Sequence, residues 1–348
     1  MELKKDLEII ANEIKSNDFK NSSILITGST GLLGSLLTKG FLTANKLFGL
    51  NNKVYALARN IEKANIVFAD FLNDGFLKIV KNEITEPIEI NKSIDYIFHT
   101  ACVTTSKEMV AKPVELIKSS VNGTINVLDF AQNHNTKSVV YLSSMEVYGV
   151  IENPNNRLKE SDLGQIDLTS VRSCYPISKR LNENLCKCYA EEYGLNVCSA
   201  RLTQTFGAGA TLEDNRIFSY IAKSAISNEN VILKSSGKSA HDYCYTTDAI
   251  AAILILSKKG ITGETYNIAN EETFSSIYDM ANMVLNTFST NAKVIVENND
   301  NAMFSKDSII KLDTKKMQSL GWIPVVNLSN MYKKLIQSYK EKLEGQKK

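Results

Sequence analysis

The chain has 348 residues, of which 43% are hydrophobic and 22% are charged, and its formal net charge is +2. This balance gives no electrostatic case for nucleic acid or an anionic membrane as partner, and no apolar run reaches the roughly 18 residues of a membrane span. The six cysteines include no Cys-x-x-Cys pair and only three histidines accompany them, so we expect reduced thiols, no metal site and a cytoplasmic location.

The first 20 residues intersperse charges with apolar residues at helical spacing. Leu3, Leu7, Ile10 and Ile14 fall on one face. This pattern predicts an amphipathic helix over 1–20 that lacks the apolar core of a signal peptide.

Residues 21–203 alternate between strand-like apolar runs and helix-length segments. The predicted strands are 23–27, 53–58, 94–99, 138–143 and 196–202. The predicted helices between them are 33–47, 113–133 and 175–193. This alternation implies right-handed crossovers and an α/β fold, a Rossmann-type doubly wound parallel sheet that binds ligands beyond the carboxyl ends of its strands.

Residues 204–348 show a looser pattern of short strands and helices. Helices are expected at 216–227, 248–257, 275–288 and 330–343. We expect a smaller, mainly substrate-binding α/β lobe that is interwoven with the Rossmann-type domain of residues 21–203, because no Pro-, Gly- or Ser-rich linker separates them. Asp248 is expected to cap the helix that follows it.

A glycine-rich turn follows the first strand and opens the next helix. Gly28 permits a tight turn, Gly31 lets a pyrophosphate approach the backbone, and Gly34 lets the helix pack on the strand. The alternative is an ordinary strand–helix turn without a ligand. The cofactor-binding residues predicted at this edge of the sheet are Gly28, Thr30, Gly31, Leu32, Leu33, Gly34 and Ala101.

The end of the second strand normally sets the choice between NAD and NADP. Ala58 stands where an acidic residue would bind the ribose 2′-hydroxyl, and Arg59 and Asn60 follow it. This favours NADP over NAD as the cofactor, the alternative being a solvated loop arginine. Glu83 and Ile84 are expected near the adenine, although a plain surface turn is the alternative there.

Tyr175 and Lys179 are four residues apart and so share one face of a helix. A protonated lysine there favours the phenolate, lowers the pKa of the tyrosine and can hold the nicotinamide ribose. Ser144 can hydrogen-bond the same substrate oxygen, while Tyr175 takes the alcohol proton and hydride leaves for the nicotinamide. This set predicts a redox enzyme that uses NADP or NAD.

With these motifs the chain resembles the extended short-chain dehydrogenases/reductases of the NAD-dependent epimerase/dehydratase family, from about residue 22 to residue 339. The resemblance rests on segments 27–34, 99–101, 122–124, 142–149, 175–179, 201–207 and 320–322. Segments 171–180 and 214–216 are most similar to the UDP-glucuronate decarboxylase and nucleotide-sugar dehydratase branches. The resemblance implies a nucleotide-diphosphate sugar as substrate, a tightly held cofactor, a transient 4-keto intermediate, and a homodimer formed through the helices at 113–133 and 175–193.

Residues that differ from the family pattern limit which of the family's reactions we expect. Glu146 falls on the carboxylate that 4,6-dehydratases use as a base, whereas Met145 replaces their acidic aspartate and cannot protonate a leaving hydroxyl. Dehydration is therefore disfavoured. Glu146 suits proton removal next to a ketone, as in epimerisation, or alternatively only orders the turn at Tyr148.

His241 replaces an arginine that the family directs at the diphosphate, so that contact is expected to rest on Arg216 and Lys238. The substrate-binding residues implied by the resemblance are Thr104, Thr105, Ser144, Met145, Gln204, Arg216, Lys238 and His241.

We therefore predict a nucleotide-sugar epimerase of bacterial surface-polysaccharide precursor synthesis, with Ser144, Glu146, Tyr175 and Lys179 as its catalytic residues. The alternatives are a dehydratase, a decarboxylase or a net ketoreductase of the same family, and a cofactor-sensing protein that does no chemistry.

Overall fold

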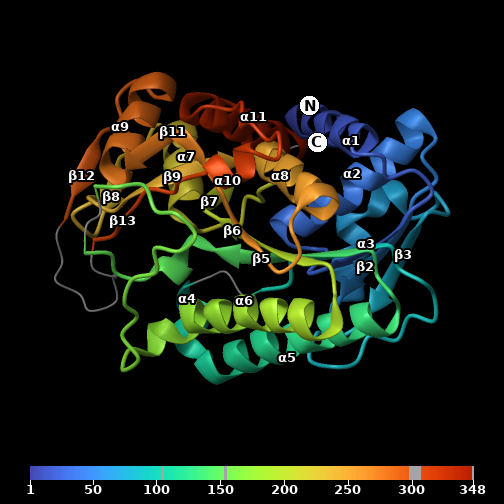
Figure 1. The fold of residues 1–348 in the computed structure, drawn as a ribbon. Helices are drawn as coiled ribbons and strands as arrows, with labels where there is room; N and C mark the ends of the chain where they lie inside the picture. The colour runs from blue at the N-terminus through green and yellow to red at the C-terminus, as the bar shows by residue number, and fades with distance from the viewer. Residues whose placement is uncertain (103–105, 153–154, 298–306, 347–348) are drawn as a thin grey trace.

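The computed structural model describes residues 1–102, 106–152, 155–297 and 307–346. Its largest element is a seven-stranded parallel sheet with the order β10-β6-β5-β4-β1-β2-β3 (Figure 1). The strands are β1 (Ser23–Thr27), β2 (Lys53–Ala58), β3 (Leu77–Lys81), β4 (Tyr96–His99), β5 (Ser138–Ser144), β6 (Val197–Leu202) and β10 (Thr265–Ile268). The predicted α/β fold with a doubly wound parallel sheet is confirmed.

Sequence reasoning located β1 and β2 to the residue, but it missed β3 and β10. β3 is an edge strand in which two lysines alternate with partly buried apolar residues, so it lacks a continuous apolar run. β10 comes from the later, less regular part of the chain and pairs with β6.

Helices cover both faces of the large sheet (Figure 1). On one face, α5 (Pro113–Asn133) and α6 (Cys174–Tyr193) pack against each other. On the other face lie α1 (Glu2–Ser16), α2 (Leu32–Phe48) and α8 (Thr246–Lys259). The glycine turn follows the carboxyl end of β1, and Ser144 ends β5, so both lie at the same edge of the sheet.

The N-terminal helix α1 packs along α2 so closely that a Cβ at Gly40 would contact Ile10. Its Asp6 is fully buried and accepts hydrogen bonds from Tyr245 Oη at 2.5 Å and from Lys334 Nζ at 2.8 Å. These bonds join α1 to β9 (Ala240–Tyr245) and α11 (Leu328–Gln346), so α1 is an integral part of the core.

The second and third sheets and the helices that cover them gather at one side of the molecule (Figure 1). A second sheet contains β7 (Gln204–Phe206), β9, β11 (Asn270–Ser276) and β13 (Ile309–Ile310), and β8 (Val231–Leu233) pairs with β12 (Val294–Val296). Two helices, α7 (Ile217–Ser227) and α9 (Ile277–Phe288), pack with α11 over them. The short helices elsewhere are α3 (Ile61–Val67), η1 (Ala69–Phe71), α4 (Ser106–Ala111), η2 (Met145–Tyr148), η3 (Val171–Ser173) and α10 (Lys315–Gln318).

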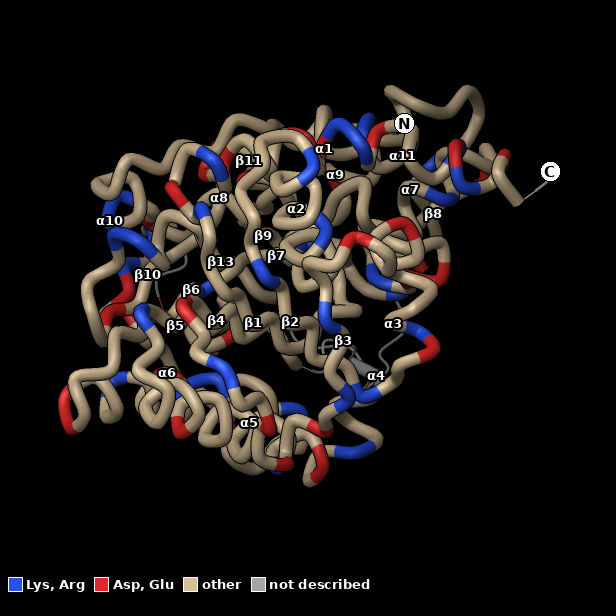
Figure 2. Tube along the Cα trace, turned by 90° about the vertical axis from the view of Figure 1, so that its right-hand side faces the viewer, with Lys and Arg blue, Asp and Glu red and all other residues tan. Residues whose placement is uncertain are grey.

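Positive and negative residues are interspersed along the trace in Figure 2, in keeping with the net charge of +2. Among the described residues, no helix is long and apolar enough to cross a bilayer.

Candidate active site

In the glycine turn between β1 and α2, two positions have no room for a side chain. Gly28 has a φ of +61°, and a Cβ there would lie 2.6 Å from the Cα of Ala101. A Cβ at Gly34 would lie 2.8 Å from the Oγ1 of Thr100. Both positions therefore require glycine, because the turn brings β1, β4 and α2 into direct contact.

Gly31 is the N-cap of α2 and offers no side chain to the first helical N–H groups. These donors and the positive end of the helix dipole face the turn, an arrangement that binds pyrophosphate. Thr30, Leu32 and Leu33 lie around it and are partly exposed. The residues present therefore fit a dinucleotide.

At the end of β2, Ala58 is buried and Arg59 is exposed. The neighbouring Asn60 is the N-cap of α3, and its Oδ1 accepts a hydrogen bond from the Lys63 N–H at 2.7 Å. The sequence prediction gave Asn60 only a cofactor role. It missed the capping role, although asparagine is among the preferred N-cap residues.

The segment after β3 lies at the same edge of the sheet as Arg59. Glu83 is exposed, whereas Ile84 packs on α5, where a Cβ at Gly123 would lie 2.8 Å from Ile84 Cγ1. Asn126 Nδ2 donates to the Ile84 carbonyl at 2.9 Å. The backbone of residue 84 is thus fixed beside α5.

Tyr175 and Lys179 lie one turn apart on α6, and both are buried. Lys179 Nζ donates to the Leu142 carbonyl at 2.6 Å and lies 4.7 Å from the ring centroid of Tyr141 and 5.8 Å from that of Tyr175. The carbonyl and the two rings therefore hold the ammonium between β5 and Tyr175.

Lys179 is charged as the sequence prediction has it, whereas the pKa of Tyr175 shifts in the opposite direction to the prediction. Burial acts to lower the pKa of Lys179, but the Cys102 thiol and Tyr175 hydroxyl outweigh it and raise that pKa, so the ammonium stays charged. Burial raises the pKa of Tyr175 and outweighs the opposing effects of Lys179 and a hydrogen bond with Ser144. The prediction of a lowered tyrosine pKa counted the lysine charge and left out burial.

His99, at the end of β4, is an uncharged side chain that connects two elements next to the site. Its Nδ1 lies 2.7 Å from Thr27 Oγ1 and its Nε2 lies 3.2 Å from Thr124 Oγ1. Burial and the Lys179 charge lower the pKa of His99 to about 3. The ring therefore joins β1 to α5 and carries no charge at neutral pH.

Ser144 and Glu146 flank Met145 at the turn that follows β5. Ser144 Oγ accepts a hydrogen bond from the Glu146 N–H at 3.2 Å. Glu146 forms an ion pair with Arg172, whose Nη2 lies 2.9 Å from each carboxylate oxygen. Sequence reasoning noted Arg172 only within a family-like segment and gave it no role.

Met145 is buried in an apolar cluster, and its sulfur accepts a hydrogen bond from Thr203 Oγ1 at 3.3 Å. The side chain has apolar neighbours in this packing, and its contact with substrate stays a prediction. Ser144 and Glu146 are the partly exposed polar residues of the turn.

A buried network holds this turn from behind. Arg180 Nε donates to the Val147 carbonyl at 2.7 Å. Arg201 pairs with Glu183 at 2.7 Å, and Ser143 Oγ donates to Glu183 at 2.5 Å. Sequence reasoning placed Ser143, Arg180 and Arg201 in family-like segments but missed these contacts, because the partners are distant in the chain and form no local motif.

Two of the predicted substrate residues lie in or next to the second sheet. His241 is buried on β9, with its Nε2 3.0 Å from Ser308 Oγ, and burial lowers its pKa to about 4. It is therefore uncharged at neutral pH, in line with the expectation that it cannot replace an arginine. Gln204 is half-buried at the start of β7.

Arg216 is already engaged within the protein. It binds Asp214 through Nε at 3.1 Å and Nη2 at 2.6 Å, and it lies over the ring of Phe218. Lys238 is exposed. The two other predicted substrate residues, Thr104 and Thr105, lie outside the described residues.

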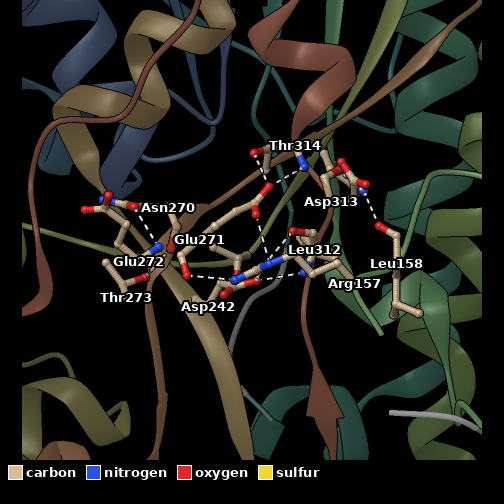
Figure 3. Close-up of polar contacts among 12 residues, drawn as sticks. Arg157, Leu158, Asp242, Asn270, Glu271, Glu272, Thr273, Leu312, Asp313 and Thr314 are labelled. Carbon is tan, nitrogen blue, oxygen red and sulfur yellow. Dashed lines mark hydrogen bonds and ion pairs between the residues drawn. The ribbon is translucent and has the colours of Figure 1, made fainter. Parts of the chain in front are cut away.

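Next to His241, Arg157 joins β9, β11 and the segment around Leu312 (Figure 3). Its Nη1 donates to Asp242 Oδ2 at 3.0 Å and to the Leu312 carbonyl at 2.9 Å. Its Nη2 and Nε reach the carbonyl and the carboxylate of Glu271, each at 2.8 Å. Since every guanidinium nitrogen has a protein partner, Arg157 has a structural role and holds β9, β11 and the Leu312 segment together.

The carboxyl edge of the sheet thus brings a dinucleotide cradle next to Ser144, Tyr175 and Lys179. The model of the NAD dependent epimerase/dehydratase family matches residues 24–269, and the chain belongs to this family of enzymes. The family predicted from the sequence motifs is confirmed.

Two similar proteins are UDP-glucuronic acid decarboxylases, one of the branches that the sequence motifs resemble. UDP-glucuronic acid decarboxylase 6 of Arabidopsis thaliana is 28% identical over 313 residues, which cover 88% of this chain and 86% of the relative. UDP-glucuronic acid decarboxylase 1 of Danio rerio is 27% identical over 327 residues, or 93% of this chain and 74% of the relative.

Solved structures share the fold. An epimerase from Methanothermobacter thermautotrophicus matches with a TM-score of 0.79 at 20% identity, covering 97% of this chain and 96% of its own. The UDP-glucuronic acid 4-epimerase of Bacillus cereus, in complex with UDP-glucuronic acid and NAD, matches with a TM-score of 0.74 at 19% identity, covering 92% and 99%.

Proposed function

We propose that this protein is an NAD(P)-dependent nucleotide-sugar epimerase that acts through a transient 4-keto sugar. The observation that carries the proposal is the position of Glu146, two residues after Ser144 and in the same site as Tyr175, with Met145 buried between them. The site thus has a base for a carbon-bound proton and lacks the acid that dehydration needs at residue 145.

The residues that would hold the cofactor are those of the glycine cradle, with Arg59 at the ribose and Lys179 at the nicotinamide end. When bound, the oxidised nicotinamide supplies a hydride acceptor and a positive charge. Arg59 supports a preference for NADP, because it is exposed at the end of β2 and no acidic side chain precedes it.

Tyr175 is proposed to accept the proton of the C4 hydroxyl as the ketone forms and to return it when the ketone is reduced. Ser144, hydrogen-bonded to Tyr175, steadies the same oxygen, and the charged Lys179 stabilises the phenolate. Because burial favours the protonated phenol, the positive charge of a bound nicotinamide would have to lower the pKa of Tyr175, so that the phenol releases its own proton to solvent before it accepts that of the C4 hydroxyl.

Glu146 is proposed to remove the proton from a carbon next to the ketone, where the carbonyl makes it acidic. Return of a proton to the opposite face inverts that carbon. The diphosphate is assigned to Arg216 and Lys238, and this requires Arg216 to share its guanidinium between Asp214 and the ligand.

A second candidate function, decarboxylation of a nucleotide-linked uronic acid, is favoured by the relatives named above. Both reactions begin with the same ketone. They differ in whether a proton or carbon dioxide leaves the neighbouring carbon.

The family resemblance and the apolar side chains on α5 and α6 also support a homodimer. Ile117 on α5 and Leu181 on α6 are 43% and 44% exposed, respectively. A helix that is apolar on two faces usually buries both.

The experiment that tests the proposed function is incubation with a panel of nucleotide sugars in deuterated water. NMR identifies the carbon that gains deuterium, and gas analysis detects carbon dioxide. Nicotinamide absorbance that stays with the protein through gel filtration would mark internal recycling of the cofactor.

A further inference from the structure

Within the part of the chain that the structure describes, the Glu146 carboxylate pairs with a cation on a different element. Arg172 lies in η3, the turn that precedes α6, and Glu146 lies in η2 after β5. One nitrogen, Nη2 of Arg172, contacts both carboxylate oxygens at 2.9 Å. The pair thus connects the two segments that carry the proposed catalytic residues.

Arg172 also lies against the catalytic tyrosine. Its guanidinium carbon is 5.7 Å from the ring centroid of Tyr175. A cation over an aromatic face at this distance is attracted to the ring. The same side chain therefore touches the proposed base and the proposed proton acceptor of the C4 hydroxyl.

The pair is placed to act during turnover. Both side chains are 31% exposed, unlike the buried Arg201–Glu183 pair behind the turn. Exposed ion pairs contribute little to stability, with typical values of about 0–1 kcal/mol. A structural role therefore does not account well for this pair, whereas a role in orienting the carboxylate does.

We propose that Arg172 is a positioning residue that fixes the Glu146 carboxylate beside Tyr175, so that proton removal from carbon follows oxidation at C4. This inference rests on the proposed function. It assigns to Arg172 a role in the carbon-proton step alone, since Tyr175, Lys179 and Ser144 carry the preceding step.

The test separates the two steps in the same variants. Reduced-nicotinamide absorbance in a single turnover reports oxidation at C4, and solvent deuterium in the sugar reports the Glu146 step. In Arg172→Met we expect oxidation within a few-fold of wild type and exchange reduced by about 100-fold, the loss typical of a misplaced reacting group. Arg172→Lys should recover part of the exchange, because a lysine keeps the charge without the planar fork.

A double variant decides whether Arg172 acts through Glu146. If it does, adding Arg172→Met to Glu146→Gln should leave oxidation at C4 and substrate affinity as they are in Glu146→Gln alone, because both survive the loss of the carboxylate. A further large loss in the double variant would show direct contact between Arg172 and substrate and would overturn the positioning role. The matched control is Lys187→Met, which removes an exposed ion pair with Glu191 on the same helix at 2.7 Å and should leave both steps unchanged.

Two outcomes distinguish failure of this inference from failure of the proposed function. Wild-type exchange that survives Arg172→Met overturns the role of Arg172 alone. A wild type that neither reduces its cofactor nor exchanges with any nucleotide sugar contradicts the proposed function, and the role of Arg172 with it. Thermal unfolding of each variant shows whether a loss of exchange reflects a loss of fold.

Discussion

The ammonium of Lys179 donates a hydrogen bond to the carbonyl of Leu142 at 2.6 Å, which connects α6 to the carboxyl end of strand β5. This bond sets the helix in register with the strand, so that Tyr175 lies beside Ser144. The loss of Lys179 would therefore affect both the charge and the position of the catalytic tyrosine.

Tyr175→Phe and Lys179→Met should each reduce turnover by at least about 100-fold, as expected when a positioned acid–base group is lost. Tyr175→Phe removes one hydroxyl and should leave the circular dichroism spectrum and unfolding midpoint near wild type. Tyr193→Phe, an exposed hydroxyl on the same helix, is the control. Near-wild-type turnover in either catalytic variant would remove the proposed mechanism.

Glu146→Gln should still transfer hydride to the cofactor but lose solvent deuterium exchange into the sugar, because an amide cannot accept the carbon-bound proton. Stopped-flow absorbance and NMR on the same samples measure the two steps. Full exchange in this variant would contradict the role of Glu146. Met145→Asp is expected to give at most a trace of dehydration, since residue 145 points into an apolar cluster.

Arg59→Ala should weaken binding of NADP and leave binding of NAD nearly unchanged, so that the preference for NADP is lost or reversed. The reason is that an arginine can pair with the 2′-phosphate, which NAD lacks. Titration calorimetry with both cofactors gives the ratio, and Lys81→Ala at the end of the adjacent strand is the control. If wild type binds NAD more tightly and Arg59→Ala changes nothing, Arg59 is only a loop charge.

The protein should be a homodimer at micromolar concentration by light scattering. Leu181→Arg should produce monomers, because it introduces a charge into the apolar surface of α5 and α6. Leu72→Arg, at a side chain that is 43% exposed, is a matched control that should stay dimeric. A monomeric wild type would refute the pairing.

Asp242 should make the free energy of unfolding depend on pH. Burial raises its folded-state pKa to about 6, while the unfolded chain keeps a value near 3.8. Between these two values the folded state binds more protons than the unfolded state, so this carboxyl lowers stability as pH rises from about 4 to 6 and adds no slope above that range.

We therefore expect the stability difference between wild type and Asp242→Asn to change by up to about 2 kcal/mol from pH 4.5 to pH 7. Urea unfolding at a series of pH values measures this stability difference. The wild type should become less stable relative to Asp242→Asn as pH rises. A difference that is constant over this range would show that Arg157 offsets the burial of the carboxylate.

The sequence predicted the parts of this molecule that are encoded locally. β1 and β2 are continuous apolar runs, and the turn at Gly28 has its own spacing, so both could be read directly. Contacts between distant segments could not. Asp248 was expected to cap α8, yet its carboxylate instead accepts hydrogen bonds from the backbone N–H groups of Val325 and Val326, 77 and 78 residues away.

The candidate site shows the same difference between local motifs and contacts of distant segments. Tyr175 and Lys179 form a motif on one helix, and that motif together with the glycine turn and Ser144 upstream predicts their role. The partnership of Glu146 with Arg172 joins two turns that are 26 residues apart, and the burial that raises the pKa of Tyr175 depends on the whole fold. Neither the pairing of Glu146 with Arg172 nor the burial of Tyr175 can be predicted from a local sequence pattern.

The most direct test of the central claim is a single incubation of the wild type with nucleotide sugars in deuterated water, followed by NMR and by nicotinamide absorbance. The account predicts a deuterium atom at a carbon next to C4, all sugar carbons retained, and no net change in the oxidation state of the cofactor. Release of carbon dioxide, a 4-keto-6-deoxy product, or consumption of one reduced cofactor per turnover would contradict it.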